Sequence, residues 1–259
     1  MSVSASARPL RALVMLLPLL VGCEEAVMVV DGVGGDFSAG SQDSDGDGIT
    51  DKDEAAAGTD PDSADSDADG WDDTAELDGN TDPLSADDHP YTGGWPIGSC
   101  RNDLQGSVLQ AGEVAPQFEL VDMYGDTVKL HDFCHMAVLV VTGAAWCGPC
   151  QAYRAEAAAF YESYYPKGLM IIDLLGETES GGEPALADLE KWADGHPYAV
   201  LADPGWAVTN QGYASGGIPA ISLLAPGAEA VIVNGYPTAA DIEAVLPAEF
   251  SLPEAEIEE

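Results

Sequence analysis

The chain has 259 residues, enough for one large domain or two small ones, and its formal net charge is −38 at pH 7. Of its 46 acidic residues, 20 lie between residues 31 and 90, where Lys52 is the only Lys or Arg. Such a block repels nucleic acids and anionic lipid surfaces and attracts cations, so we expect no nucleic-acid partner. The block is either a disordered acidic linker or an organised segment, and its pattern decides between the two.

The first 22 residues have the features of a signal peptide. Arg8 and Arg11 precede the apolar run 12–21, which is too short to span a bilayer. The run ends in Leu20-Val21-Gly22-Cys23, which resembles the lipobox of bacterial lipoproteins. The resemblance implies cleavage before Cys23, lipidation of its sulfur, and a location in the cell envelope on the periplasmic or cell-surface side. The alternative is an ordinary secretory signal followed by an unrelated cysteine.

The cysteine count fits an exported protein. Without Cys23 an even number remains, which suits two disulfides in an oxidising compartment: Cys100, Cys134, Cys147 and Cys150. No later segment is long and apolar enough to be a transmembrane helix, so we expect the lipid to be the only membrane anchor.

An internal repeat follows a Gly- and Ser-rich stretch, 31–41, that we expect to be flexible. The pattern Asp-x-Asp-x-Asp-Gly-x-x-Asp-x-x-Glu occurs twice with a shift of 22 residues, and Thr59-Asp60-Pro61 recurs with the same shift at Thr81-Asp82-Pro83. A disordered linker would not keep this register. Carboxylates at positions 1, 3 and 5 converge on a hard cation, Gly at 6 permits the turn, and Glu at 12 can bind with both oxygens. We predict structural calcium held by Asp43, Asp45, Asp47, Asp51, Glu54, Asp65, Asp67, Asp69, Asp73 and Glu76.

These segments resemble EF-hand-like calcium loops. Their Thr-Asp-Pro spacers and their lack of full flanking helices are more similar to thrombospondin type 3 repeats than to paired EF-hands. Dockerin modules, which also carry two loops at similar spacing, are the alternative. The resemblance implies a calcium-stabilised spacer with little regular structure. Extracellular modules of this kind bind calcium at about 10⁻⁴–10⁻³ M, which suits a structural spacer better than a regulatory switch.

The C-terminal part has the composition of a folded α/β domain. Apolar runs typical of buried strands occur at 137–141, 169–175, 198–201, 220–224 and 231–233. Helical patterns occur at 151–164, at 184–193 and from Thr238 onward. This alternation predicts a sheet covered on both faces. The predicted organisation is a signal peptide (1–22), a flexible tether (23–42), two calcium repeats (43–90), a linker (91–112), the α/β domain (113–250) and an acidic tail (251–259).

A redox motif, Trp146-Cys147-Gly148-Pro149-Cys150, follows the predicted strand 137–141 and opens the predicted helix. A helix N-terminus offers unpaired N–H groups and the positive end of the helix dipole, which stabilise the thiolate of Cys147. We predict that Cys147 is the exposed nucleophile, that Cys150 resolves the mixed disulfide, and that Trp146 shields the rim. The alternative, half of a zinc site, needs a second C-x-x-C, which the sequence lacks.

The motif is that of thioredoxin, and the resemblance covers the domain 113–250. Val114-Ala115-Pro116-Gln117-Phe118, followed by Gly125, Val128, Leu130 and Phe133, is similar to the first strands of TlpA-like and peroxiredoxin-like members. Gly217-Ile218-Pro219 matches the loop whose proline is cis in this superfamily. The resemblance implies a thioredoxin fold, in which helices flank a central mixed sheet, and thiol–disulfide oxidoreductase activity without an organic cofactor. It also implies that the backbone of Ile218 pairs with an extended substrate, whereas a turn proline without function is the alternative for Pro219.

Three positions depart from the family pattern. Val141 stands six residues before Cys147, where thioredoxin has a buried Asp that accepts a proton, so Cys150 must give its proton to water or to another group. Tyr153 stands where TlpA-like proteins often have Glu. Ala144 replaces the Thr that peroxiredoxins need, so peroxidase activity is not expected.

The remaining cysteines and the motif together define the predicted function. We expect a structural disulfide between Cys100 and Cys134 that fastens the linker to the domain, with two free thiols as the alternative. The dipeptide between Cys147 and Cys150 favours the reducing end of the family, because the Pro-His of strong oxidants is absent. The sequence predicts dithiol–disulfide exchange with cysteine-containing envelope proteins and with an unidentified redox partner. The alternative is a calcium-binding surface scaffold or adhesion lipoprotein whose thioredoxin-like domain is inactive.

Overall fold

The computed structural model describes residues 42–252. The predicted signal peptide, Cys23, nearly all of the predicted tether and most of the acidic tail lie outside these residues. No helix in the part of the chain that the structure describes has the length and apolar character needed to cross a membrane.

Five strands form the central sheet: β3 Ala137–Gly143, β4 Leu169–Leu175, β5 Ala199–Ala202, β6 Ala220–Ala225 and β7 Glu229–Gly235. Their order is β5-β4-β3-β6-β7; β3, β4 and β5 are parallel, and β6 and β7 are antiparallel to their neighbours. Every residue of β3 and β4 is buried, because these central strands are covered on both faces. This burial explains why both strands are unbroken apolar runs in the sequence.

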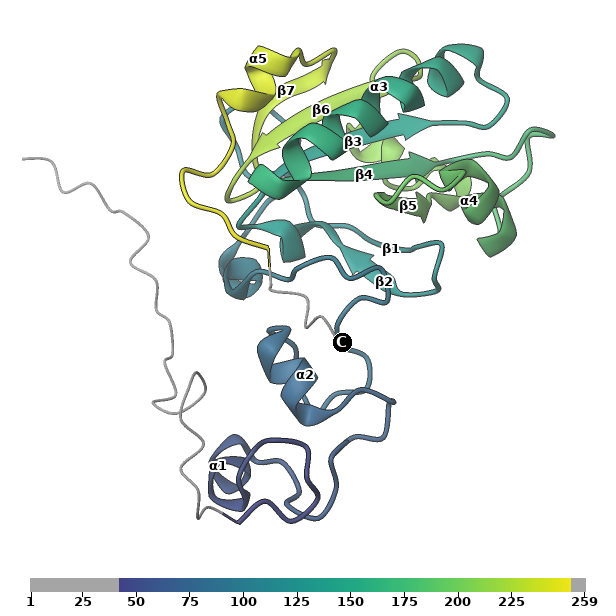
Figure 1. Cartoon of the computed structure of the whole chain (residues 1–259). Helices are drawn as coiled ribbons and strands as arrows, with labels where there is room; N and C mark the ends of the chain where they lie inside the picture. The colour runs from purple at the N-terminus through teal and green to yellow at the C-terminus, as the bar shows by residue number, and fades with distance from the viewer. Residues whose placement is uncertain (1–41, 253–259) are drawn as a thin grey trace, which may run out of the picture. The chain divides into compact units, whose positions relative to one another are not determined.

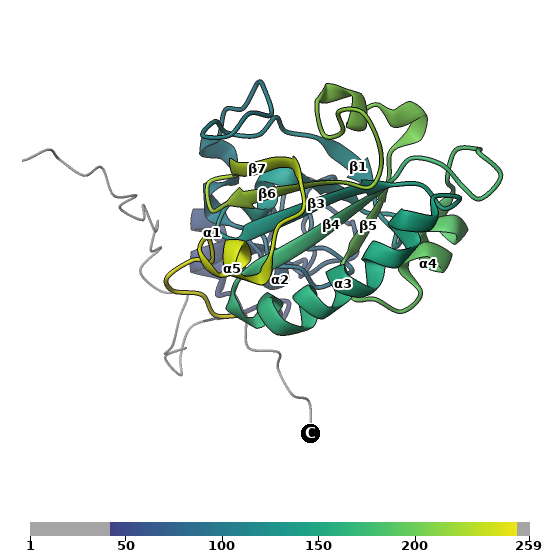
Figure 2. The same ribbon diagram turned by 90° about the horizontal axis from the view of Figure 1, so that it is seen from above.

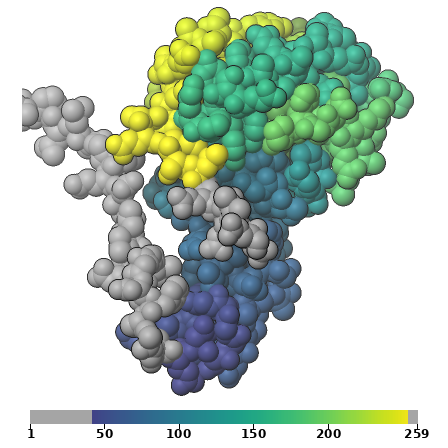
Figure 3. Space-filling model, viewed as in Figure 1, coloured from purple at the N-terminus to yellow at the C-terminus, as the bar shows by residue number. Residues whose placement is uncertain are grey.

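Helices cover the sheet on the face turned toward the viewer in Figure 1. They are α3 Gly148–Tyr164, α4 Leu186–Ala193 and α5 Ala239–Glu243. α3 runs across the strands, and the view from above places α5 on the same side as α3 (Figure 2). In the space-filling view from the same side, the teal atoms of the α3 region form the surface of the domain, with the green atoms of the α4 region beside them (Figure 3).

The chain before β3 crosses the sheet from one edge to the other. Val114 forms an isolated antiparallel bridge with Glu229 of β7, and Asp122 forms one with Leu201 of β5. Between these bridges Phe118 is buried against Tyr213, and a hairpin of β1 Glu119–Val121 and β2 Thr127–Lys129 follows. A mixed sheet flanked by helices is the thioredoxin fold, so the predicted fold class is confirmed.

The segment 91–112, expected to be a linker, packs onto the domain instead. Tyr91, Trp95, Ile97 and Leu109 are buried and belong to the same hydrophobic cluster as the sheet and α3. The Gly and Pro residues that indicated a tether lie between these apolar side chains. The segment therefore buries apolar surface in the domain core, and the prediction of a linker was wrong for these residues.

The repeat segment 42–90 has two short helices, α1 Asp51–Ala57 and α2 Asp73–Asp78. Thr50 caps α1 by accepting a hydrogen bond from the N–H of Asp53. The two repeats touch, because the hydroxyl of Thr74 donates to the backbone oxygen of Asp47 at 2.9 Å. Within the described chain the hydrophobic cluster of the domain begins at Tyr91, so the repeats are not part of that core.

Candidate redox site and cation loops

Cys147 is the N-cap residue of α3. Its sulfur accepts a hydrogen bond from the backbone N–H of Cys150 at 3.1 Å, and Pro149 occupies the first helical turn. Cys147 and Cys150 form a disulfide with their Cα atoms 5.2 Å apart. An N–H donor directed at the sulfur stabilises a thiolate after reduction, and the helix dipole acts in the same direction.

Exposure does not distinguish the two sulfurs in this oxidised form. Cys147 is 4% exposed and Cys150 is 3% exposed, whereas the intervening Gly148 and Pro149 are exposed. The expectation of an exposed Cys147 therefore does not hold in the disulfide state. The difference between the two cysteines lies in hydrogen bonding, because Cys147 is at the cap position and Cys150 lies inside the first turn of α3.

Trp146 is anchored at the rim by a carboxylate that the sequence did not single out. Its indole N–H donates to Glu177 at 2.6 Å, and the indole N–H of Trp206 donates to the other oxygen of Glu177 at 3.2 Å. Trp146 remains 51% exposed. Glu177 follows β4 by two residues, and only the fold brings it beside a side chain 31 positions earlier in the chain.

The loop before β6 reaches the reactive sulfur from the other side. The carbonyl oxygen of Ile218 lies 3.7 Å from Sγ of Cys147, although 71 residues separate them in sequence. The peptide bond between Ile218 and Pro219 is cis. Sequence reasoning had grouped these two residues with the cysteines, and the structure places them at the same site.

Cys150 packs directly against the sheet. A Cβ atom added to Gly143 at the end of β3 would lie 3.3 Å from Sγ of Cys150, so a side chain at this position would press against Cys150. One turn farther along α3, Tyr153 is buried, and burial raises the pKa of its hydroxyl. On β4, Asp173 is buried and accepts a 2.9 Å hydrogen bond from the indole N–H of Trp192.

Asp173 was not identified from the sequence. Burial raises its pKa to about 6, and the hydrogen bond from Trp192 and the charge of Arg154 oppose that rise. The one available clue was a single acidic residue in an otherwise apolar strand, 169–175.

Two clusters of carboxylates mark the loops of the repeats. Asp43, Asp45 and Asp47 place one oxygen each within 4.8 Å of one another, and the corresponding residues of the second loop do the same: Asp65, Asp67 and Asp69. Glu54 and Glu76 are fully buried, and none of their four carboxylate oxygens has a hydrogen-bond partner. Such oxygens need a cation or a proton, and the residues present therefore fit a calcium ion in each loop.

Electrostatics in the loops agree with this fit. Burial, followed by the charges of Asp45 and Asp47, raises the pKa of Glu54 to about 7. Burial, followed by the charges of Asp67 and Asp69, raises the pKa of Glu76 to about 8. Each glutamate thus lies close to the aspartates of its own loop, and a divalent cation would offset their mutual repulsion.

The ninth residue of each repeat is engaged differently. Both carboxylate oxygens of Asp51 accept hydrogen bonds from Ser44, from its N–H at 2.9 Å and from its hydroxyl at 3.0 Å. Asp73 accepts the same pair of hydrogen bonds from Ser66. These aspartates close the loop by pairing with a serine, and they stand outside the two three-residue clusters.

A disulfide joins Cys100 to Cys134, with their Cα atoms 6.0 Å apart. Polar contacts surround it: Arg101 pairs with Asp88, and the hydroxyl of Tyr91 donates to Asp132. The bond therefore fastens the packed segment 91–112 to the turn that precedes β3.

Two family descriptions match parts of this chain. Residues 111–215 match the AhpC/TSA family, and residues 43–62 match the bacterial TSP3 repeat. The predicted resemblances to a thioredoxin-like domain and to a thrombospondin type 3 repeat are thereby confirmed.

Relatives of known function match the same domain. The chain is 29% identical over 140 residues to the thiol-disulfide oxidoreductase ResA of Geobacillus kaustophilus, which covers 53% of this chain and 76% of that protein. It is 32% identical over 66 residues to ResA of Bacillus thuringiensis, which covers 26% of this chain and 38% of that protein. The second match thus spans less than half of that relative.

Solved structures with similar folds include two redox proteins. The thioredoxin domain of a thiol-disulfide oxidoreductase from Bacteroides vulgatus is 22% identical, has a TM-score of 0.43, and aligns over 53% of this chain and 96% of its own. A thiol:disulfide interchange protein of the thioredoxin family from Chlorobium tepidum is 16% identical, has a TM-score of 0.42, and aligns over 51% and 94%.

Proposed function

We propose a function from the premise that residues 111–215 form a thioredoxin-like domain of the AhpC/TSA family and that this chain is a thiol–disulfide oxidoreductase. It exchanges dithiols and disulfides with cysteine-containing proteins of the bacterial cell envelope, and it acts in the reducing direction. The observation that carries the exchange chemistry of this proposal is the hydrogen bond from the N–H of Cys150 to the sulfur of Cys147 at the start of α3.

In the proposed reaction the thiolate of Cys147 attacks a substrate disulfide and forms a mixed disulfide. Cys150 then attacks the sulfur of Cys147, which releases the reduced substrate and closes the Cys147–Cys150 bond. The carbonyl of Ile218, 3.7 Å from Sγ of Cys147, supports binding of an extended substrate backbone along this loop. An external dithiol donor must then reduce the pair again.

The test is reduction of insulin disulfides by the purified chain, followed by trapping with Cys150→Ser. Wild type should reduce insulin, and Cys150→Ser should accumulate mixed disulfides with envelope proteins through Cys147. An inactive wild-type protein would favour a scaffold or adhesion lipoprotein instead.

Calcium is proposed as the structural ion of the repeats. The ligands are the aspartate clusters together with Glu54 and Glu76, whose buried oxygens lack partners. Titration calorimetry with calcium at millimolar concentration tests this proposal, and the absence of heat from two sites would reject it.

A lipid anchor on Cys23 completes the proposal. It rests on the sequence Leu20-Val21-Gly22-Cys23 and on the preceding apolar run. Cys23→Ser should abolish lipidation, which fractionation and mass spectrometry of the expressed protein can detect.

A further inference from the structure

The resolving step needs a proton acceptor. Cys150 is 3% exposed and packs against Gly143, so its thiol lies away from bulk water. Burial disfavours a thiolate, yet Cys150 must become one to attack the mixed disulfide. A nearby buried base would solve this problem.

The register of the sheet places a carboxylate on the correct face. Asp173 of β4 lies directly opposite Val141 of β3 in the parallel pairing. Val141 and Gly143 share a face because strand residues alternate, and that face carries Cys150. Directly opposed residues of neighbouring strands also share a face, so Asp173 lies on the side of the sheet that α3 covers. Among the residues of the five strands, Asp173 is the one buried carboxylate.

The surroundings of Asp173 leave one oxygen able to accept a proton. Its Oδ2 accepts the hydrogen bond from Trp192, whereas its Oδ1 is buried without a partner. Two other buried acids lie next to the sheet and differ from Asp173. The oxygens of Asp203 accept three hydrogen bonds from Val208 and Thr209. Oδ1 of Asp122, which bridges to β5 ahead of the β2 strand, accepts three backbone N–H bonds within its own turn. Both acids are therefore committed to their own turns, and Asp173 is not.

The groups that interact with Asp173 come from three parts of the chain. α3 contributes the charge of Arg154 and the hydroxyl of Tyr153, α4 contributes the indole of Trp192, and the hydroxyl of Tyr198 lies at the start of β5. Arg154 is the one cation among them, and it stabilises the carboxylate form of Asp173. A carboxylate held beside one cation, with one free oxygen, is suited to take up a proton and lose it again.

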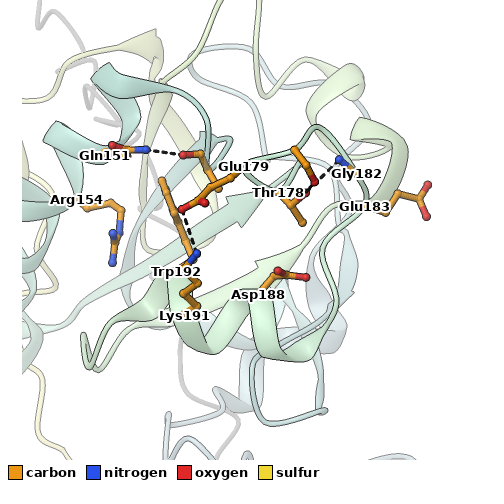
Figure 4. Close-up of a pocket in the computed structure, with 11 residues that line it drawn as sticks. Gln151, Arg154, Thr178, Glu179, Gly182, Glu183, Asp188, Lys191 and Trp192 are labelled. Atoms are coloured by element: carbon orange, nitrogen blue, oxygen red, sulfur yellow. Dashed lines mark hydrogen bonds and ion pairs between the residues drawn. The ribbon is translucent and has the colours of Figure 1, made fainter.

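A cavity connects this cluster with solvent. It has a volume of about 670 Å³ and is lined by Arg154 and Trp192, together with exposed residues that include Glu183 (Figure 4). The guanidinium of Arg154 lies 4.4 Å from the centre of the Trp192 ring; Trp192 donates its hydrogen bond to Asp173, and the charge of Arg154 acts on the same carboxylate. Water in this cavity can therefore reach Arg154 and Trp192, the two side chains through which the cavity borders on the surroundings of Asp173.

We propose that Asp173 accepts the proton of Cys150 during resolution and exchanges it with solvent through the cavity lined by Arg154 and Trp192. This inference rests on the proposed function. The thiol of Cys150 gives its proton to the carboxylate of Asp173, and its sulfur bonds to the sulfur of Cys147. The bond between Cys147 and the substrate sulfur breaks, and the substrate thiolate leaves and takes a proton from water. The substrate gains two electrons, and the cysteine pair loses them.

The experiment separates attack from resolution. The reduced full chain is mixed with an aromatic disulfide that releases a coloured thiolate in each step, and both releases are followed by stopped flow. The first release reports attack by Cys147, and the second reports resolution by Cys150. Both rates are measured between about pH 5 and about pH 9, which spans the raised pKa of Asp173, about 6, and the ordinary pKa of a thiol, about 8.5.

Asp173→Asn should slow the second release by about tenfold or more near neutral pH, leave the first unchanged, and remove the lower inflection of the pH profile. Val141→Asp combined with Asp173→Asn moves the carboxylate from β4 to the directly opposed position on β3. This double variant should restore the rate of the second release. Glu190→Gln, the control at an exposed acid of α4 that does not line the cavity, should change neither release. An unchanged second rate in Asp173→Asn, or equal slowing of both releases, would overturn the proposal.

The wild-type profile is decisive even where a variant fails to fold. Absence of an inflection below that of the thiol in the second release of wild type would overturn the role of Asp173. If wild type released no thiolate in either step, both the proposed function and this inference would be rejected. If wild type released thiolate in both steps and Asp173→Asn did so at the same rates, only the inference would be rejected.

Discussion

The indole N–H of Trp146 donates a 2.6 Å hydrogen bond to Glu177. The residue next to the reactive Cys147 is therefore held by a carboxylate from the loop that follows β4. This contact joins the C-x-x-C motif to the loop after β4. It also brings a negative charge to the rim of a site whose chemistry forms a thiolate.

Replacing Glu177 should therefore change the acidity of Cys147. Glu177→Gln removes the charge and keeps a hydrogen-bond acceptor, so we expect the pKa of the Cys147 thiol to fall by up to about one unit. Alkylation rates of the reduced protein against pH measure this pKa. The control is Glu179→Gln, which alters an exposed ion pair with Lys191 and should leave the pKa unchanged. A rise in the pKa of Cys147 in Glu177→Gln would contradict this account.

The two cysteines should differ sharply in reactivity after reduction. Cys147→Ser should abolish exchange, whereas Cys150→Ser should still attack disulfides and remain trapped as a mixed disulfide. The pKa of Cys147 should lie below the unperturbed value of about 8.5, because the N–H of Cys150 and the dipole of α3 stabilise its thiolate. Mass spectrometry after limited alkylation identifies which sulfur reacts first, and prior labelling of Cys150 would reverse the assignment.

Asp173 should make the domain less stable as the pH rises. Its folded-state pKa is raised to about 6 from the ordinary 3.8, so its stabilising contribution is complete below about pH 3.8 and is lost as the pH rises through 6. A shift of about two units corresponds to about 3 kcal/mol.

Asp173→Asn should remove this dependence, and we expect it to unfold at a higher denaturant concentration than wild type at pH 7. The advantage should disappear near pH 4. Urea unfolding at both pH values measures the difference, and an advantage that is equal at both would show that the charge of Asp173 is not its cause.

Calcium removal should loosen the repeats and spare the domain. The domain core begins at Tyr91 and includes no side chain from 42–90, so a chelator should raise protease cleavage within 43–90 while the sheet stays folded. Glu54→Gln with Glu76→Gln should show the same cleavage in the presence of calcium. Asp78→Asn, an exposed acid of α2 outside both clusters, is the control and should stay protected. Equal cleavage with and without calcium would count against ion binding.

The Cys100–Cys134 disulfide should contribute strongly to stability. It closes a loop with a sequence separation of 34, for which chain entropy gives about 4 kcal/mol. Replacing both cysteines with serine should lower the denaturation midpoint and expose segment 91–112 to protease, without changing the insulin-reduction rate of the folded protein. A midpoint equal to that of wild type would mean that the packing of Tyr91 and Trp95 suffices to hold the segment.

The sequence by itself determined the features that depend on local pattern. The run 169–175 predicted β4 with its bounds, because a strand buried on both faces is continuously apolar. The C-x-x-C motif predicted a helix N-terminus, since Cys147, Gly148 and Pro149 suit the cap and first turn. The shift of 22 residues predicted two related loops, because the spacing of carboxylates around a turn is a local property.

Only the tertiary structure decided which distant residues meet. The pairing of Val141 with Asp173 depends on the register of two strands, and the contact of Trp146 with Glu177 depends on where a loop returns to the sheet. The burial of segment 91–112 was missed because its apolar residues follow no helical or strand period, although Tyr91 and Trp95 bury their rings in the core. Local periodicity records which face of an element is buried, whereas the partner on that face is chosen by packing along the whole chain.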